Sequence, residues 1–77
     1  MNRPVTVRVE CHPGHRGEEV PRAFFLGDRR INVVEVLDCW PGRDHGYFKV
    51  LGSDGGLYIL RHDMPFGEWE ITLFEQR

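Results

Sequence analysis

Residues 33–40, Val-Val-Glu-Val-Leu-Asp-Cys-Trp, constrain the fold more than any other stretch of the chain. The segment is the longest apolar one, and its three valines follow Ile31. β-Branched side chains lose rotamer freedom in a helix and pack well on a pleated sheet. The apolar residues also fit a helical spacing, but no Ser or Thr cap precedes them and Gly27-Asp28 suggests a hairpin turn. We therefore predict a strand, with a β-bulge near Val34-Glu35 where the apolar alternation slips.

Five other short strands are predicted around this one, separated by turns rich in Gly, Pro and Asp. The first is residues 4–10, in which three valines alternate with polar side chains. The others are residues 22–26, 47–51, 57–61 and 68–74. Residues 11–21 are polar and broken by proline and glycine, so they are predicted to form a loop.

Six short strands and no convincing helix indicate an all-β chain with a single domain over residues 1–77. A meander of this length buries its one apolar face best by curling on itself. The expected fold is a small SH3-like or Tudor-like barrel, or a strongly bent antiparallel meander of five to six strands. Trp40 is expected near one barrel end because its indole N–H needs a partner. The predicted core is Val7, Phe24, Val33, Val36, Leu37, Phe48, Val50, Leu57, Ile59, Trp69 and Ile71.

Composition narrows the environment and the partners. The formal net charge of −2 creates no field that would draw the whole chain to nucleic acid or anionic lipid. No apolar run reaches the roughly 18 residues of a membrane span, and no signal-peptide segment is seen. We therefore expect a bacterial-type cytoplasmic protein with no membrane contact, whose two cysteines are free thiols.

Cys11, His12 and His15 form the densest chemical cluster. With Cys39 they offer the thiolate and imidazole ligands of a tetrahedral zinc site. The pattern lacks a Cys-x-x-Cys mate, however, and a solvated loop is the favoured explanation, with a metal-stabilised domain as the alternative. No metal and no cofactor is therefore favoured.

Two acid–base pairs, Asp44-His45 and His62-Asp63, both fall in predicted turns. Aspartate is expected in turns for backbone reasons, and no nucleophile accompanies either pair in a supporting motif. We predict no catalytic residues and a protein that is not an enzyme.

Aromatic side chains at strand ends give the main functional hypothesis. In SH3-like barrels, aromatic-lined grooves between loops bind partners. The alternative is a second small cluster that only closes the barrel end. Interleaved arginines would also suit single-stranded nucleic acid through stacking and phosphate contacts, although neighbouring aspartates weaken the field. We expect a monomeric, non-catalytic binding module that docks a protein partner, with single-stranded or damaged DNA as the alternative ligand. The predicted binding residues are Trp40, Tyr47, Tyr58, Phe66, Arg29, Arg30 and Arg43.

A longer pattern begins at residue 21. It comprises Pro21, Phe24, Gly27, Arg29, Val33, Val36, Leu37, Trp40, Tyr47, Phe48, Val50, Gly56, Tyr58, Leu60, Gly67 and Trp69. This pattern resembles a bacterial domain-of-unknown-function family, found alone or encoded near Y-family, mutagenesis-type DNA polymerase relatives. The matching residues are mostly core and turn residues, so the resemblance supports the expected fold. It also implies an association with DNA repair, and it implies no activity. The polar segment 11–19 lies outside it.

Overall fold

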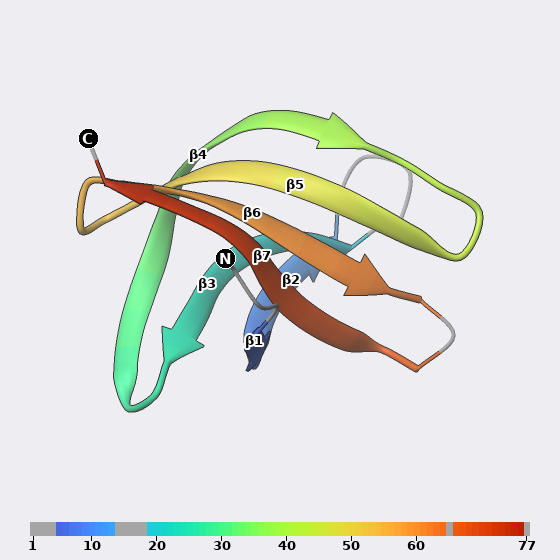
Figure 1. Ribbon diagram of the computed structural model, residues 1–77, viewed down its shortest axis with the longest axis horizontal. Helices are drawn as coiled ribbons and strands as arrows, with labels where there is room; N and C mark the ends of the chain where they lie inside the picture. Colours follow the sequence, from blue (N-terminus) through green and yellow to red (C-terminus); the bar gives the residue numbers. More distant parts are fainter. Residues whose placement is uncertain (1–4, 14–18, 65, 77) are drawn as a thin grey trace.

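The computed structural model of the chain describes residues 5–13, 19–64 and 66–76. Within these ranges the protein is all-β, with seven antiparallel strands in one sheet and no helix, so none that could cross a membrane (Figure 1). The strands are β1 (Val5–Val7), β2 (Val9–Pro13), β3 (Glu19–Leu26), β4 (Arg29–Trp40), β5 (His45–Gly52), β6 (Gly56–Asp63) and β7 (Glu68–Gln76).

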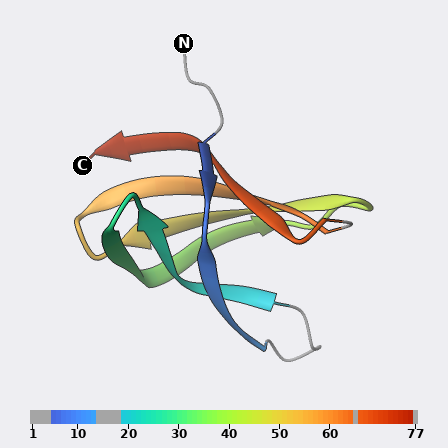
Figure 2. The same cartoon turned by 90° about the horizontal axis from the view of Figure 1, so that it is seen from below.

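The sheet curls because its two outermost strands are consecutive in the chain. The strand order is β1-β7-β6-β5-β4-β3-β2, and only Arg8 separates β1 from β2. β1 pairs with β7, whereas β2 pairs with β3. At the change of partner, the Phe25 N–H donates to the Arg8 carbonyl over 3.0 Å. Figure 2 shows this first segment running from β7 on one side of the molecule to β3 on the other. The predicted barrel-like all-β fold is confirmed.

Several strands differ from their predicted limits. The predicted strand 4–10 is two strands, because the chain changes partner at Arg8; Pro4 lies outside the described residues. The predicted loop 11–21 is wrong at both ends, since β2 continues to Pro13 and pairs there with the start of β3. Pro21 is accommodated opposite Cys11, where the β2–β3 register shifts, as is usual for proline inside a sheet. Residues 14–18 of that predicted loop lie outside the description.

The strand prediction for residues 33–40 is confirmed, and so is the bulge. The pairing of β4 with β5 shifts register between Val33 and Glu35, and again between Val36 and Asp38. Each bulge bends the strand and increases its twist. A strand that begins against β3 can therefore end against β5.

The buried core of the described residues only partly matches the predicted one. Its buried members include the predicted Phe24, Val50, Trp69 and Ile71, while Val7, Val33 and Phe48 pack against it from partly buried positions. Ala23, Ile31 and Leu60 are buried without having been predicted. Val36 and Leu37 were predicted to be core and are wrong, because they remain 37% and 41% exposed.

Strand β6 presents the opposite face to the one predicted. Tyr58 and Leu60 are fully buried, whereas Leu57 and Ile59 are only half-buried. The ring of Tyr58 meets that of Phe24 edge-on at 4.7 Å between centroids. Its hydroxyl donates to Asp54 in the β5–β6 turn, so the one polar atom of this buried side chain is satisfied. A buried hydrogen-bonded tyrosine thus takes the place predicted for leucine and isoleucine.

Candidate functional site

Strands β3 and β4 separate after their hairpin. They pair from Leu26 with Arg29 to Ala23 with Asn32, around a turn in which Gly27 has a φ of 62°. Beyond that point β3 pairs with β2, and β4 pairs with β5. Figures 1 and 2 both show the two strands diverging from the hairpin. The barrel wall is therefore open between the first residues of β3 and the last residues of β4.

A cavity of about 300 Å³, here called the end cavity, lies in this opening. Its wall is mostly apolar, and Glu19 brings a carboxylate to it from β3. The end cavity is lined by Glu19, Cys39, Trp40, Pro41, Gly46, Tyr47, Phe48, His62 and Met64. Its volume is at the lower end of the range for small-molecule sites, so it suits one apolar side chain.

Gly46 helps to keep the end cavity open. A Cβ built there would meet the Trp40 carbonyl oxygen at 3.6 Å and the Met64 Cε at 3.7 Å. These are ordinary van der Waals separations, and the residue has no positive φ, so a methyl group would fit without strain. A Gly46→Ala substitution would therefore occupy part of the cavity and leave the backbone undisturbed.

The polar side of the end cavity is formed by Glu19 and His62. The His62 Nε2 lies 3.6 Å from the Glu19 Oε2, which is an ion pair when the imidazole is protonated. The imidazole also stacks on the Trp69 indole, with centroids 4.1 Å apart and planes at 5°. His62 is thus held between the start of β3 and β7, and its largely buried ring is positioned rather than free. An exposed carboxylate at the mouth is available to a cationic group.

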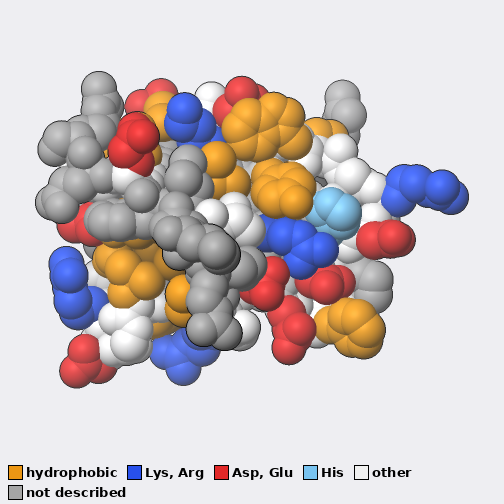
Figure 3. Space-filling model, in the orientation of Figure 1, with side chains coloured by type: hydrophobic (Ala, Val, Ile, Leu, Met, Phe, Trp, Pro, Cys, Tyr) orange, Lys and Arg blue, Asp and Glu red, His pale blue; other side chains and the backbone are white. Residues whose placement is uncertain are grey.

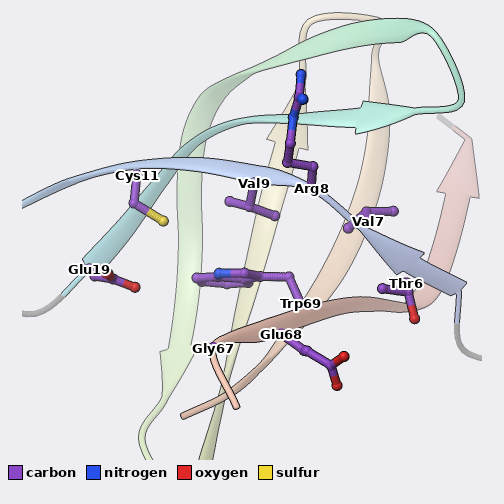
Figure 4. A pocket seen from close by; sticks show the side chains of 9 residues that line it. All are labelled: Thr6, Val7, Arg8, Val9, Cys11, Glu19, Gly67, Glu68 and Trp69. Carbon is purple, nitrogen blue, oxygen red and sulfur yellow. The ribbon is translucent and has the colours of Figure 1, made fainter. Parts of the chain in front are cut away.

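A second, shallower cavity of about 530 Å³ lies on the other side of Glu19, between β2 and β7. Figure 4 shows the Cys11 thiol directed into it, on the same side as Glu19 and Trp69. Burial, and then the Glu19 carboxylate, raise the pKa of Cys11 to about 11. The thiol is therefore protonated at neutral pH, and a protonated thiol is a poor nucleophile and metal ligand.

The possible zinc set is not assembled by the described residues. Cys11 and His12 are neighbours on β2, so their side chains leave opposite faces of the strand. His15 lies outside the described residues. Where side chains are described, no group of three or more His, Cys, Asp or Glu residues could hold a metal ion.

The two neighbouring aspartate–histidine pairs, Asp44-His45 and His62-Asp63, lie in different environments. His62 and Asp63 are adjacent on β6 and face opposite sides, with Asp63 lying 3.9 Å from Arg61. His45 packs edge-on against Tyr47, with ring centroids 5.4 Å apart. Among the described residues, no hydrogen bond or ion pair joins either imidazole to the carboxylate of its own pair.

The predicted binding residues divide into separate places. Trp40 and Tyr47 line the end cavity, and Arg43 lies in the turn that follows Trp40. Phe66 is 76% exposed in the β6–β7 turn and does not line the cavity. The placement of Tyr58 at the rim is wrong, because its ring is in the core.

Arg29 and Arg30 lie at the opposite end of β4, so they do not flank Trp40. The Arg30 Nη1 is 2.6 Å from the Glu10 Oε1, and its guanidinium lies 5.8 Å from the Phe25 ring centroid. Arg8 covers the same ring at 4.3 Å. The aromatic rim around Trp40 and the arginines at positions 29 and 30 therefore belong to two separate surfaces.

Sequence reasoning missed several residues of the end cavity, chiefly Glu19, His62 and Met64. Glu19 fell in the predicted loop, and the other two fell in a predicted connection between strands. Phe48 had been placed in the core, where it only partly lies. The only signal in the sequence was the concentration of aromatic residues around the two glycine-containing turns at this end.

In the space-filling view, hydrophobic side chains reach the surface toward this end of the molecule beside a histidine (Figure 3).

A scan against protein-family models finds no match, and searches of the curated proteins and of the solved structures find none. The resemblance to the polymerase-associated family therefore stays a prediction, and function is argued from the geometry of the chain alone.

Proposed function

We propose that the protein is a binding module that docks a protein partner by taking one apolar side chain of that partner into the end cavity. The observation that carries this proposal is the apolar cavity between β3 and β4, open to solvent and rimmed by Trp40 and Met64. Both rim residues are more than two-fifths exposed. Contiguous exposed apolar surface around a cavity typically marks a binding site, and large aromatic side chains commonly dominate its energetics.

The chemistry of the lining supports binding rather than catalysis. The nearby Cys11 thiol is held protonated, and the His62 imidazole is stacked on Trp69 and directed to Glu19. A polar pair of this kind orients a ligand at the mouth, and the apolar wall supplies the contact area. In this proposal Trp40, Tyr47 and Phe48 are the contact residues.

The proposal is tested by selecting peptides from a random phage-displayed library against the full chain, then measuring their affinities by amide NMR titration. Trp40→Ala should weaken binding about tenfold, because a half-exposed tryptophan at a cavity mouth is a typical hot spot. Gly46→Ala should weaken it several-fold by filling the cavity. Phe66→Ala is the matched control, since Phe66 is an exposed aromatic at the same end that does not line the cavity.

Equal affinity of the wild type, Trp40→Ala and Gly46→Ala would remove the end cavity from the binding site. A loss confined to Phe66→Ala would move the site to the β6–β7 turn. Either outcome contradicts the proposal as stated.

A second candidate is single-stranded nucleic acid at the hairpin end, which is favoured by the two guanidinium groups of Arg8 and Arg30 around the Phe25 ring. Such an arrangement offers phosphate contacts beside a stacking platform. It ranks second because Arg30 is already paired with Glu10 and Arg8 covers the ring. Fluorescence polarisation of a labelled oligonucleotide should show salt-dependent binding that is lost in Arg30→Glu. No change of polarisation at low salt excludes this candidate.

A further inference from the structure

The second half of β4 is an edge of the sheet. Residues 33–40 pair with β5 on one side, and the β3–β4 pairing ends at Asn32. Within the described part of the chain, these residues form no backbone–backbone hydrogen bond outside the strand ladders. A strand paired on one side presents alternate N–H and C=O groups along its other side. The N–H of Cys39 already donates to the Asp38 Oδ1 over 2.8 Å, so an added strand has to pair with the other groups of this edge or displace that side chain.

This edge carries only part of the protection that sheet edges usually have, namely its two bulges and the charges of Glu35 and Asp38. Lysine and proline are the common protecting residues, and neither occurs between positions 33 and 40. Val34 is 63% exposed, and Val36, Leu37 and Trp40 are also exposed. An exposed apolar edge strand is the surface to which extended peptides add in strand-addition complexes.

We propose that the partner segment is extended and cationic, and that it adds as a further strand along residues 33–40. The inference rests on the proposed function, because the added strand is what would bring an apolar side chain to the end cavity. Cys39 and Trp40 belong both to this edge and to the cavity lining. The side chain of Cys39 shares a face with its cross-strand partner Phe48, which also lines the cavity. A partner residue opposite Cys39 would therefore direct its own side chain toward the cavity.

The charges around the edge select a cationic segment. The exposed acids of the edge and the adjoining rim are Glu19, Glu35, Asp38 and Asp44. Lys49 lies opposite Asp38 across the β4–β5 ladder, and Arg61 is engaged by Glu70 over 3.1 Å. Arg43 is the one exposed cation in the adjacent turn. A segment that alternates apolar and basic residues would match the apolar groups and complement the acids.

The same charges disfavour a second copy of this chain as the occupant. Two paired β4 edges would bring the Glu35 and Asp38 carboxylates of both copies together, and in the antiparallel register centred between Val36 and Leu37 Glu35 of one copy directly faces Asp38 of the other. Like charges directly opposite on neighbouring strands destabilise the pairing. The lack of a basic residue at positions 33–40 leaves nothing on the edge itself to neutralise them.

The test uses the full chain and three synthetic peptides. In the first, lysine alternates with valine; in the second, glutamate replaces lysine; in the third, the lysine peptide is N-methylated so that it cannot donate backbone hydrogen bonds. Only the first peptide should produce saturable shifts of the amide signals of residues 33–40 and slow their hydrogen exchange. Glu35→Lys should weaken the lysine peptide about fivefold and strengthen the glutamate peptide, because a cross-strand attraction becomes a repulsion. Glu75→Lys is the matched control, since Glu75 is an exposed acid on β7 opposite Leu57, away from this edge.

The outcomes separate this inference from the proposed function. If the lysine peptide shifts only residues of the end cavity, or if the N-methylated peptide binds equally well, strand addition is overturned and the cavity proposal stands. If residues 33–40 respond and Gly46→Ala leaves the affinity unchanged, strand addition stands and the cavity proposal fails. If sedimentation equilibrium shows a dimer and dilution of the protein shifts the amide signals of residues 33–40, a second copy is the occupant and the cationic partner is overturned.

Discussion

The two halves of β4 differ in composition and in surroundings, and the more apolar half, residues 33–40, holds no buried side chain. Residues 29–32 pair with β3, and their one apolar side chain, Ile31, is 1% exposed. Residues 33–40 pair with β5 alone, and Val34, Leu37 and Trp40 remain at the surface. Hydrophobicity therefore does not decide which half is core. Whether a residue of β4 is buried depends instead on whether β3 still pairs with β4 at that position.

This comparison extends to the two ends of the molecule. At the hairpin end, the side chains of Phe24, Ile31 and Tyr58 are fully buried. At the other end, apolar residues line an open cavity. We infer that the hairpin end supplies most of the stability and that the open end is available for binding. The predictions below are ordered by the size of the effect that would break this division.

The largest contrast is expected between Ile31→Ala and Leu37→Ala, two truncations in the same strand. Ile31 is fully buried, so its truncation should lower the free energy of unfolding by about 2–5 kcal/mol. Leu37 is two-fifths exposed, so its truncation should cost no more than about 1 kcal/mol. Urea denaturation followed by tryptophan fluorescence measures both. Similar losses in the two variants would contradict the division between the ends.

The next contrast compares two glycines of β5. A Cβ at Gly52 would lie 2.9 Å from the Ile31 Cγ2 and 3.0 Å from the Tyr58 Cε1, whereas one at Gly46 meets nothing closer than 3.6 Å. Gly52→Ala should therefore destabilise the protein by about 1–3 kcal/mol through overpacking. Gly46→Ala should leave the free energy of unfolding nearly unchanged while weakening ligand binding. Thermal unfolding of the two variants checks the pair, and a destabilised Gly46→Ala would show that the end cavity is tighter than described.

A smaller effect is expected from Tyr58→Phe, which removes only the hydroxyl that donates to Asp54. The loss should be about 1 kcal/mol, the usual net contribution of one hydrogen bond, and somewhat more with a charged acceptor. Desolvation acts to raise the pKa of Asp54, but hydrogen bonds from Tyr58 and from the Gly56 N–H outweigh it, and the pKa lies below its usual value. Desolvation and the hydrogen bond to Asp54 raise the pKa of Tyr58.

These pKa changes fix the sign of the pH dependence. A lowered carboxyl pKa adds stability that is present above the usual aspartate pKa of about 4 and is lost as the pH falls further. A raised phenol pKa adds stability that is present below about pH 10 and is lost as the pH rises above it. Tyr58→Phe should flatten the stability profile at both extremes, measured by urea unfolding at a series of pH values. An unchanged profile would mean that this hydrogen bond does not tie the β5–β6 turn to the core.

The last comparison is between the two cysteines, which we expect to differ in their rate of alkylation. Cys39 is exposed at the open end, whereas Cys11 is partly buried with a pKa of about 11. At about pH 8 the thiolate fraction of Cys11 is about a hundredfold below that of an ordinary thiol, so iodoacetamide should modify Cys39 first. Peptide mass spectrometry after timed quenching measures the order. Simultaneous modification of both thiols in the folded chain, as expected after denaturation, would contradict the burial of Cys11.

Local features were predicted well because their causes are local. The strand at residues 33–40, its bulge, and the glycine turns follow from β-branched side chains, from slipped alternation and from positive φ at Gly27 and Gly55. The buried face of β6 was predicted wrongly because four consecutive residues, Leu57 to Leu60, are all apolar or aromatic. Such a run contains no alternation, so only the neighbours of the strand can select its buried face.

The sequence by itself determined an all-β chain with short strands, tight glycine turns and an aromatic-rich end, since these depend on residues near one another. Only the tertiary structure decided how far β3 accompanies β4, and so where the barrel wall opens. That choice depends on which strand pairs with which, and pairing is settled by contacts between residues far apart in the chain. The end cavity, the free edge of β4 and the separation of Arg29 and Arg30 from Trp40 all follow from it.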